Sequence, residues 1–327
     1  MASDRFIHEG KNAWQRLEHL LETLDRTHLR RLHREEVKEL GRIYRRTASD
    51  LAIARAESRD PRLINYLNSL VIRAHGRIYR AEALEGGRRV SQFFLKDFPQ
   101  TFRRTWRYTA TAFAVFFVFT LLSFVGTWRD PEFSELAGID PFFREFAVNA
   151  RVRWWESLNE ANQVGAGFIM SNNIWVMFRA FALGALGGFG TLYEMARFGG
   201  HIGAVLSLTY RAGFGNELVT FMSGHGVLEL SAIFIAGGAG MLFGSAVLFP
   251  GDLSRFDALR LRGHEAIQLV VGCIPILVIA GIIEGFISPA PINPAFKFSI
   301  AAVTFITLYA YLLLAGRESN STEHSTG

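Results

Sequence analysis

The stretch SGHGVLELSAIFIAGGAG, from Ser223 to Gly240, decides the fold class because it combines membrane-like hydropathy with two titratable side chains. It is apolar enough to lie in a bilayer, yet it contains His225 and Glu229. Ionisable side chains at membrane depth are costly and are usually retained for a partner or a function. The two residues are four apart, so a helix places them on one face. The stretch therefore indicates a membrane helix that has a polar face.

The rest of the chain supports a multi-pass membrane protein. Several apolar runs of about 20 residues, the length that crosses a hydrocarbon core, follow a polar first third. We therefore expect an all-α, polytopic membrane helix bundle of about six spans, some of them broken or re-entrant, within residues 106–316. The expected spans are 107–127, 172–193, 199–213, 217–250, 268–288 and 296–316.

The fourth of these spans is too long for one straight crossing. Its 34 residues would form a helix of about 51 Å at 1.5 Å per residue, against a hydrocarbon core of about 30 Å. It must break, tilt or emerge, and the glycine-rich GGAG at 237–240 is the expected break. Two re-entrant half-helices in 199–250 are the alternative.

The N-terminal part has a different composition. Residues 1–105 hold 22 Lys and Arg against 14 Asp and Glu, a net charge of +8. Apolar residues such as Trp14, Leu17 and Leu21 recur at helical spacing, which predicts a helical domain over 1–85. Phenylalanines alternate with Lys and Arg in 86–105, the pattern of an amphipathic helix that lies in the membrane interface. Residues 317–327 form a polar tail.

Charge distribution predicts the orientation. Residues 128–162 carry 4 Arg against 7 acidic side chains, whereas the N-terminal domain and the loop 251–265 are rich in Arg. Cytoplasmic segments are enriched in Lys and Arg. We therefore expect the loop 128–171 outside the cytoplasm and both termini inside, in a bacterial inner membrane. The basic charge then indicates contact with membrane lipids, and no nucleic acid partner is expected.

Few charged residues fall inside the apolar runs. Glu229 and Glu284 are the carboxylates expected in or at the edge of the membrane, and Arg179 is the cation expected mid-span. An unpaired carboxylate in lipid protonates or seeks a cation, so we expect Arg179 to meet Glu229. His225, Glu229 and Arg179 then form either a sealed cluster that fixes helix packing, a substrate or proton path, or a catalytic site.

No strong catalytic motif is present. The sequence HEAIQ at 264–268 lacks the second histidine of a zinc metalloprotease motif. Ser223 and His225 are two apart, so on one helix they point to different sides. The single cysteine, Cys273, excludes a cysteine-based zinc cluster. The sequence predicts no catalytic residue, metal or cofactor.

Three small-xxx-small glycine pairs predict closely packed helices. They are Gly184 with Gly188, Gly199 with Gly203, and Gly240 with Gly244.

Three motifs occur in a fixed order after YLNSLVIRAHGRIY at 66–79. They are NNIWVMFRAFALGALGGFGTLYEM, HGVLELSAIFIAGGAG and IIEGFISPAP. Over about 60–316 the chain resembles the stage II sporulation protein M family. The resemblance implies an integral membrane protein that works with peptidoglycan-processing partners during engulfment of the forespore, although many members occur in bacteria that do not sporulate. It implies site positions at Asn173, His225, Glu229 and Glu284, without an assigned chemistry.

These observations favour a non-enzymatic scaffold that recruits cell-envelope partners. The helical domain and the 128–171 loop would be its two docking surfaces. The alternative is a transporter or channel-like protein with a polar path lined by His225, Glu229, Glu284 and Arg179, and an intramembrane hydrolase comes third. A homo-oligomer is left open.

Overall fold

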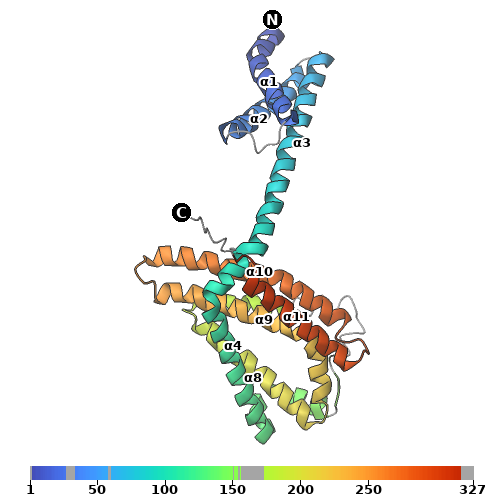
Figure 1. The fold of residues 1–327 in the computed structure, drawn as a ribbon, viewed down its shortest axis with the longest axis vertical. Coiled ribbons are helices and arrows are strands. Elements are labelled where there is room, and N and C mark those ends of the chain that lie inside the picture. Colours follow the sequence, from blue (N-terminus) through green and yellow to red (C-terminus); the bar gives the residue numbers. More distant parts are fainter. Residues whose placement is uncertain are drawn as a thin grey trace, which may run out of the picture. The chain divides into compact units, whose positions relative to one another are not determined.

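The computed structural model describes residues 2–26, 34–57, 60–149, 151–153, 155 and 173–317. All regular elements within these ranges are helical, which confirms the all-α expectation. The chain divides into two compact units, Met1–Gln92 and Phe93–Gly327 (Figure 1). The boundary lies seven residues beyond the end of the expected domain at residue 85.

The first unit is a bundle of three helices, α1 (Ala2–Arg26), α2 (Arg34–Glu57) and α3 (Pro61–Gln92). Asp60 precedes α3, and its carboxylate accepts a hydrogen bond from the Arg62 backbone N–H at 2.9 Å, as an N-cap does. Apolar faces of all three helices form one core. Its buried residues are Trp14, Leu17, Leu20, Leu21, Leu24, Leu40, Ile43, Leu51, Ala54, Leu67, Leu70 and Ala74.

Polar side chains tie these helices together at the rim of the core. The Trp14 indole donates to the Asp50 carboxylate at 2.8 Å, and the Tyr66 hydroxyl donates to Glu18 at 2.9 Å. Burial and the Glu18 carboxylate together raise the pKa of Tyr66 to about 12. Each contact links two different helices, so the three helices form a specific bundle with satisfied buried donors.

The second unit contains the apolar helices. It begins with the π-helical turn η2 (Phe93–Asp97) and continues through α4 (Phe98–Arg129), α8 (Phe189–Arg211), α9 (Gly215–Leu248), α10 (Arg255–Phe286) and α11 (Pro294–Leu314). Short turns η3 (Pro131–Glu135), α5 (Pro141–Phe143) and η4 (Arg144–Asn149) follow α4. In the described part of the chain, four helices are long and apolar enough to cross a membrane: Gly86–Arg129, α9, α10 and α11. They support a multi-pass membrane protein, with four candidate spans where about six were expected.

The expected spans 172–193 and 199–213 do not form two separate membrane-spanning helices in the structure. The described helical segment Asn173–Ala185 ends in the 3-10 turn η5 (Leu183–Ala185). Gly187 and Gly188 then adopt φ values of 66° and 86°, which other residues rarely adopt. The chain therefore reverses inside 172–193, and the stretch 199–213 belongs mostly to α8. The ionisable residues Glu194, Arg197, His201 and Arg211 are spread along α8, and α8 is not among the four candidate spans.

The expected break at 237–240 is wrong, because α9 is one uninterrupted helix from Gly215 to Leu248. Its glycines serve close packing instead. A Cβ on Gly240 would lie 2.6 Å from the Thr191 hydroxyl and 2.9 Å from the Ala180 carbonyl oxygen. The small residues therefore allow α9 to contact both the 173–185 segment and α8, as the small-xxx-small pattern predicted.

Helix α8 lies beside α4 (Figure 1). The contacts run in the same order along both helices: Gly199 packs on Phe116, Gly203 packs on Thr120, and Arg211 donates to the Trp128 carbonyl. The two helices therefore run in the same direction, and α8 lies against the apolar α4 over most of its length.

The segment 86–105, expected as one interfacial helix, is divided at its middle. Its first residues extend α3, and Phe98 and Phe102 at the start of α4 are buried among residues of α10 and α11. Arg103 donates to the carbonyls of Leu312 and Ala315, each at 2.8 Å. A cation at the last carbonyls of α11 satisfies that helix end. This stretch therefore packs into the membrane unit.

Candidate functional site

The polar residues on α9 meet residues from two other segments. His225 and Glu229 lie one turn apart on α9, as their spacing predicted. Glu284 reaches them from the last turn of α10, and Asn173 from the start of the 173–185 segment. Ser288 lies just beyond the end of α10 and also contacts His225. We call His225, Glu229 and Glu284 the His–Glu–Glu cluster.

The cluster is enclosed and has a definite geometry. His225 Nε2 lies 3.8 Å from Glu229 Oε2 and 3.6 Å from Glu284 Oε1. The other ring nitrogen, Nδ1, lies 2.8 Å from the Ser288 hydroxyl. Asn173 donates from Nδ2 to Glu284 Oε2 at 3.3 Å. His225 is 4% exposed and Glu284 is 8% exposed, whereas the Glu229 side chain keeps 15% of its surface accessible.

The expected pairing of Arg179 with Glu229 is wrong. Arg179 donates from Nε to Glu194 at 2.9 Å, and its Nη2 forms an ion pair with the same carboxylate. Arg197 also binds Glu194, at 2.7 Å. Because the chain reverses at Gly187 and Gly188, the start of α8 lies beside the 173–185 segment. This arrangement places Glu194 next to Arg179. Arg179 therefore does not belong to the His–Glu–Glu cluster.

Three buried polar residues were missed from the sequence. Glu194 is 2% exposed, and it was assigned no role from the sequence because it lies near the end of the expected span 172–193. Ser288 lies in the IIEGFISPAP motif but was given no role. Lys297 is 7% exposed and donates to the Ser288 carbonyl oxygen. It lies in the first turn of α11, where a lysine at the end of an apolar run does not indicate burial in the sequence.

The Ser288 hydroxyl, His225 and a glutamate resemble a nucleophile, a base and an orienting acid. The surroundings of Ser288 argue against that role. Ser288 is 1% exposed, and Gly224 packs so closely that a Cβ there would lie 3.1 Å from the Ser288 hydroxyl oxygen. A substrate carbonyl could not reach this oxygen without displacing α9. The arrangement instead fixes the orientation of the His225 ring.

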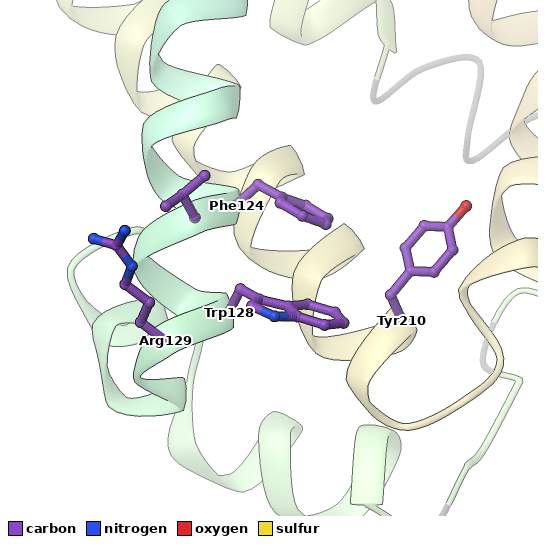
Figure 2. Close-up of a pocket in the computed structure, with 5 residues that line it drawn as sticks. Phe124, Trp128, Arg129 and Tyr210 are labelled. Atoms are coloured by element: carbon purple, nitrogen blue, oxygen red, sulfur yellow. The ribbon is translucent and has the colours of Figure 1, made fainter.

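A second feature shares no residue with this cluster. An open, mostly apolar pocket of about 410 Å³ lies at the ends of α4 and α8. Figure 2 shows Phe124 and Trp128 of α4 facing Tyr210 of α8, with Arg129 turned away from them. Aromatic rings gathered at helix ends are typical of the membrane–water interface.

Comparison with known protein families identifies the membrane unit. The model of the family described as stage II sporulation protein M matches residues 112–289, more than half of the 327-residue chain. This chain belongs to the stage II sporulation protein M family. The family region contains Asn173, Arg179 and the whole His–Glu–Glu cluster. The match confirms the resemblance noted in the sequence, over a shorter range than 60–316.

The N-terminal unit has its own match. A model described as a domain of unknown function, DUF8413, matches residues 4–80. The two matches do not overlap and fall on different structural units. No curated protein and no solved structure matches the chain.

Proposed function

We propose that this family member is a membrane-anchored scaffold that recruits cell-envelope proteins. The observation that supports this proposal best is the division of the chain into two units, each with a core of its own and each matched by a separate family model. One unit holds the chain in the bilayer, and the other offers a charged helical surface. In this proposal Met1–Gln92 lies in the cytoplasm and the 128–171 segment outside.

Each side of the membrane then has its own class of partner. The outer segment would bind a protein that processes peptidoglycan, since peptidoglycan lies outside the bacterial inner membrane. Leu136, 82% exposed, follows η3 in this segment. Ile72, 62% exposed, lies on the surface of α3 in the other unit. Large exposed apolar side chains among polar neighbours are suitable positions at which to look for protein contacts.

Photo-crosslinking in living cells tests the scaffold. A photoreactive phenylalanine analogue is placed at Leu136, at Ile72 or, as a lipid-facing control, at Val303 of α11, which is 61% exposed. We expect a discrete adduct at Leu136 with a peptidoglycan-processing protein, and an adduct at Ile72 with a cytoplasmic protein. A self-adduct would instead identify a homo-oligomer. If both positions give the same pattern as Val303, the scaffold proposal is wrong.

One observation favours a second candidate, the transporter or channel-like protein. In the described part of the chain, no Lys or Arg forms an ion pair with Glu229 or Glu284, so both carboxylates remain available to a cation or proton. His225, Glu229 and Glu284 would line the path, without Arg179. Proteoliposomes separate the two candidates: a folded Glu229→Gln protein that loses an ion flux shown by the unmodified protein supports transport.

A further inference from the structure

Three potential metal ligands converge where α9, the end of α10 and the 173–185 segment meet. Among the described residues, His225, Glu229 and Glu284 form the one group of three such side chains whose ligand atoms all lie within 4.8 Å of one another. They come from two helices, and Glu229 and Glu284 are 55 positions apart in the sequence. Folding therefore assembles this group, and no local sequence motif defines it.

The orientation of His225 is that of a metal ligand. A metal-binding histidine generally uses its second ring nitrogen for a hydrogen bond that fixes the ring. Here Nδ1 has the Ser288 hydroxyl at 2.8 Å. Nε2 forms no hydrogen bond within the described part of the chain, although His225 is only 4% exposed. It points between the two carboxylates.

The distances leave room for an ion. Nε2 lies 3.6 Å and 3.8 Å from the nearest carboxylate oxygens, which is too far for a hydrogen bond. Zinc–nitrogen and zinc–oxygen bonds of about 2.0–2.1 Å in tetrahedral geometry separate neighbouring ligand atoms by about 3.3 Å. The two distances from Nε2 exceed this value by only a few tenths of an ångström. All three ligand atoms lie within 4.8 Å of one another, so rotation of the glutamate side chains would bring them to the separation that one ion requires.

Charge gives an independent reason for a cation. The two carboxylates lack a Lys or Arg partner among the described residues, because Arg179 binds Glu194 and the Lys297 ammonium donates to the Ser288 carbonyl. Carboxylates withdrawn from water need a compensating charge. One divalent cation balances two carboxylates. Asn173, which donates to the second oxygen of Glu284 at 3.3 Å, would hold that carboxylate in place.

We propose that His225, Glu229 and Glu284 bind one divalent transition-metal ion, with Ser288 and Asn173 as positioning residues. One imidazole nitrogen and two carboxylate oxygens suit Zn²⁺ or Mn²⁺, whereas the group offers no thiolate or thioether for a soft ion such as Cu⁺. Three protein ligands leave a further coordination position for water. This site does not depend on the scaffold role: an ion here would join α9 to α10 in a scaffold as well as in a transporter.

Metal binding to the purified full chain tests the proposal. The protein is extracted in detergent, freed of its affinity tag, stripped with a chelator and equilibrated with Zn²⁺ or Mn²⁺, and bound metal is measured by mass spectrometry. We expect one ion per chain. His225→Asn, Glu229→Gln and Glu284→Gln should each weaken binding at least tenfold. Ser288→Ala should weaken it by roughly 10- to 100-fold while the stoichiometry at saturation stays at one.

Two substitutions serve as matched controls. Glu217→Gln removes an exposed carboxylate from the same helix, and His264→Asn removes an exposed histidine from α10. Both should bind metal as the unmodified protein does. Added metal should raise the melting temperature of the unmodified protein and of these controls, because it binds the folded state. The ligand variants should show no such rise at the same metal concentration.

The double variant Glu229→Gln/Glu284→Gln keeps the test decisive if a single variant folds poorly. It removes both negative charges together, so it should fold without metal and should not bind it. The proposal is overturned if the unmodified protein binds no ion, or if this folded double variant binds as much metal as the unmodified protein. It is also overturned if the controls lose as much affinity as the ligand variants, since binding would then be adventitious.

Discussion

Glu194 is a buried carboxylate that forms ion pairs with two arginines, Arg179 and Arg197. The Glu194 side chain is 3% exposed, whereas those of Arg179 and Arg197 are 38% and 39% exposed. Each arginine side chain therefore remains partly accessible, whereas the Glu194 carboxylate is buried and has the two arginines as its counter-charges. Glu229 has no such partner, so the two carboxylates should respond differently to the loss of Arg179.

Substitution of the arginines tests this difference. Arg179→Gln alone should cost about 1 kcal/mol, because Arg197 still binds Glu194 and the Arg179 side chain is partly exposed. Arg179→Gln/Arg197→Gln leaves Glu194 buried without a cation and should cost about 3–5 kcal/mol. Adding Glu194→Gln should recover part of that loss. The measurement is thermal unfolding in detergent.

A matched comparison uses the other carboxylate. If Glu229→Gln, and not Glu194→Gln, rescued the double arginine variant, the assigned pairing would be wrong.

Residue spacing explains which parts of the site could be predicted. His225 and Glu229 were placed together because a helix repeats every 3.6 residues. Glu284 was recognised as a carboxylate at the membrane edge. Residue spacing within one helix could not predict its contact with His225 of α9, because Glu284 lies on a different helix. The partner of Arg179 could not be predicted either, since Glu194 and Glu229 were both available and the reversal at Gly187–Gly188 decides between them.

At the scale of elements, the glycines distinguish two uses of one residue type. Gly187 and Gly188 permit a reversal through positive φ, whereas Gly240 stays helical and permits close contact. Both stretches are rich in glycine in the sequence. From the sequence we predicted both close packing and a break in a helix. We assigned the break to 237–240 because the length of the apolar run and its glycine content were the only criteria, and neither one distinguishes a helical glycine from one with positive φ.

The ends of α9 and α11 lie within two residues of the predicted spans 217–250 and 296–316, because each is a long apolar run. Helices α4 and α10 begin 9 and 13 residues before their predicted spans, because their first turns are polar and hydropathy does not mark them.

Two glycines of α9 provide a matched test of close packing. Gly240→Ala would place a Cβ 2.6 Å from the Thr191 hydroxyl, whereas a Cβ on Gly226 has nothing within 4 Å. Gly240→Ala should lower the free energy of unfolding by about 1–3 kcal/mol through overpacking. Gly226→Ala should be neutral or stabilise by up to about 1 kcal/mol, because alanine favours a helix. Unfolding in detergent measures both, and equal effects would argue against the contact between α8 and α9.

At the scale of the whole molecule, the account depends on how the chain crosses the membrane. Four helices are candidate spans, an even number that is compatible with both termini on one side. Helix α8 runs in the same direction as α4, beside it. If α8 also crosses, the 173–185 segment must return the chain first, and the number of crossings becomes six. We propose the six-crossing arrangement with both termini in the cytoplasm.

Cysteine labelling with a membrane-impermeant reagent tests this central claim most directly. On a Cys273→Ala background, single cysteines replace Leu136, Leu186, Ser49 or Asp252, all of them exposed. Leu136 is 82% exposed, so a cysteine there is accessible to the reagent. The account predicts labelling from outside at position 136 alone, with 49, 186 and 252 labelled only after permeabilisation. Labelling of position 186 from outside would contradict the six crossings, and labelling of position 49 with protection of 136 would contradict the orientation itself.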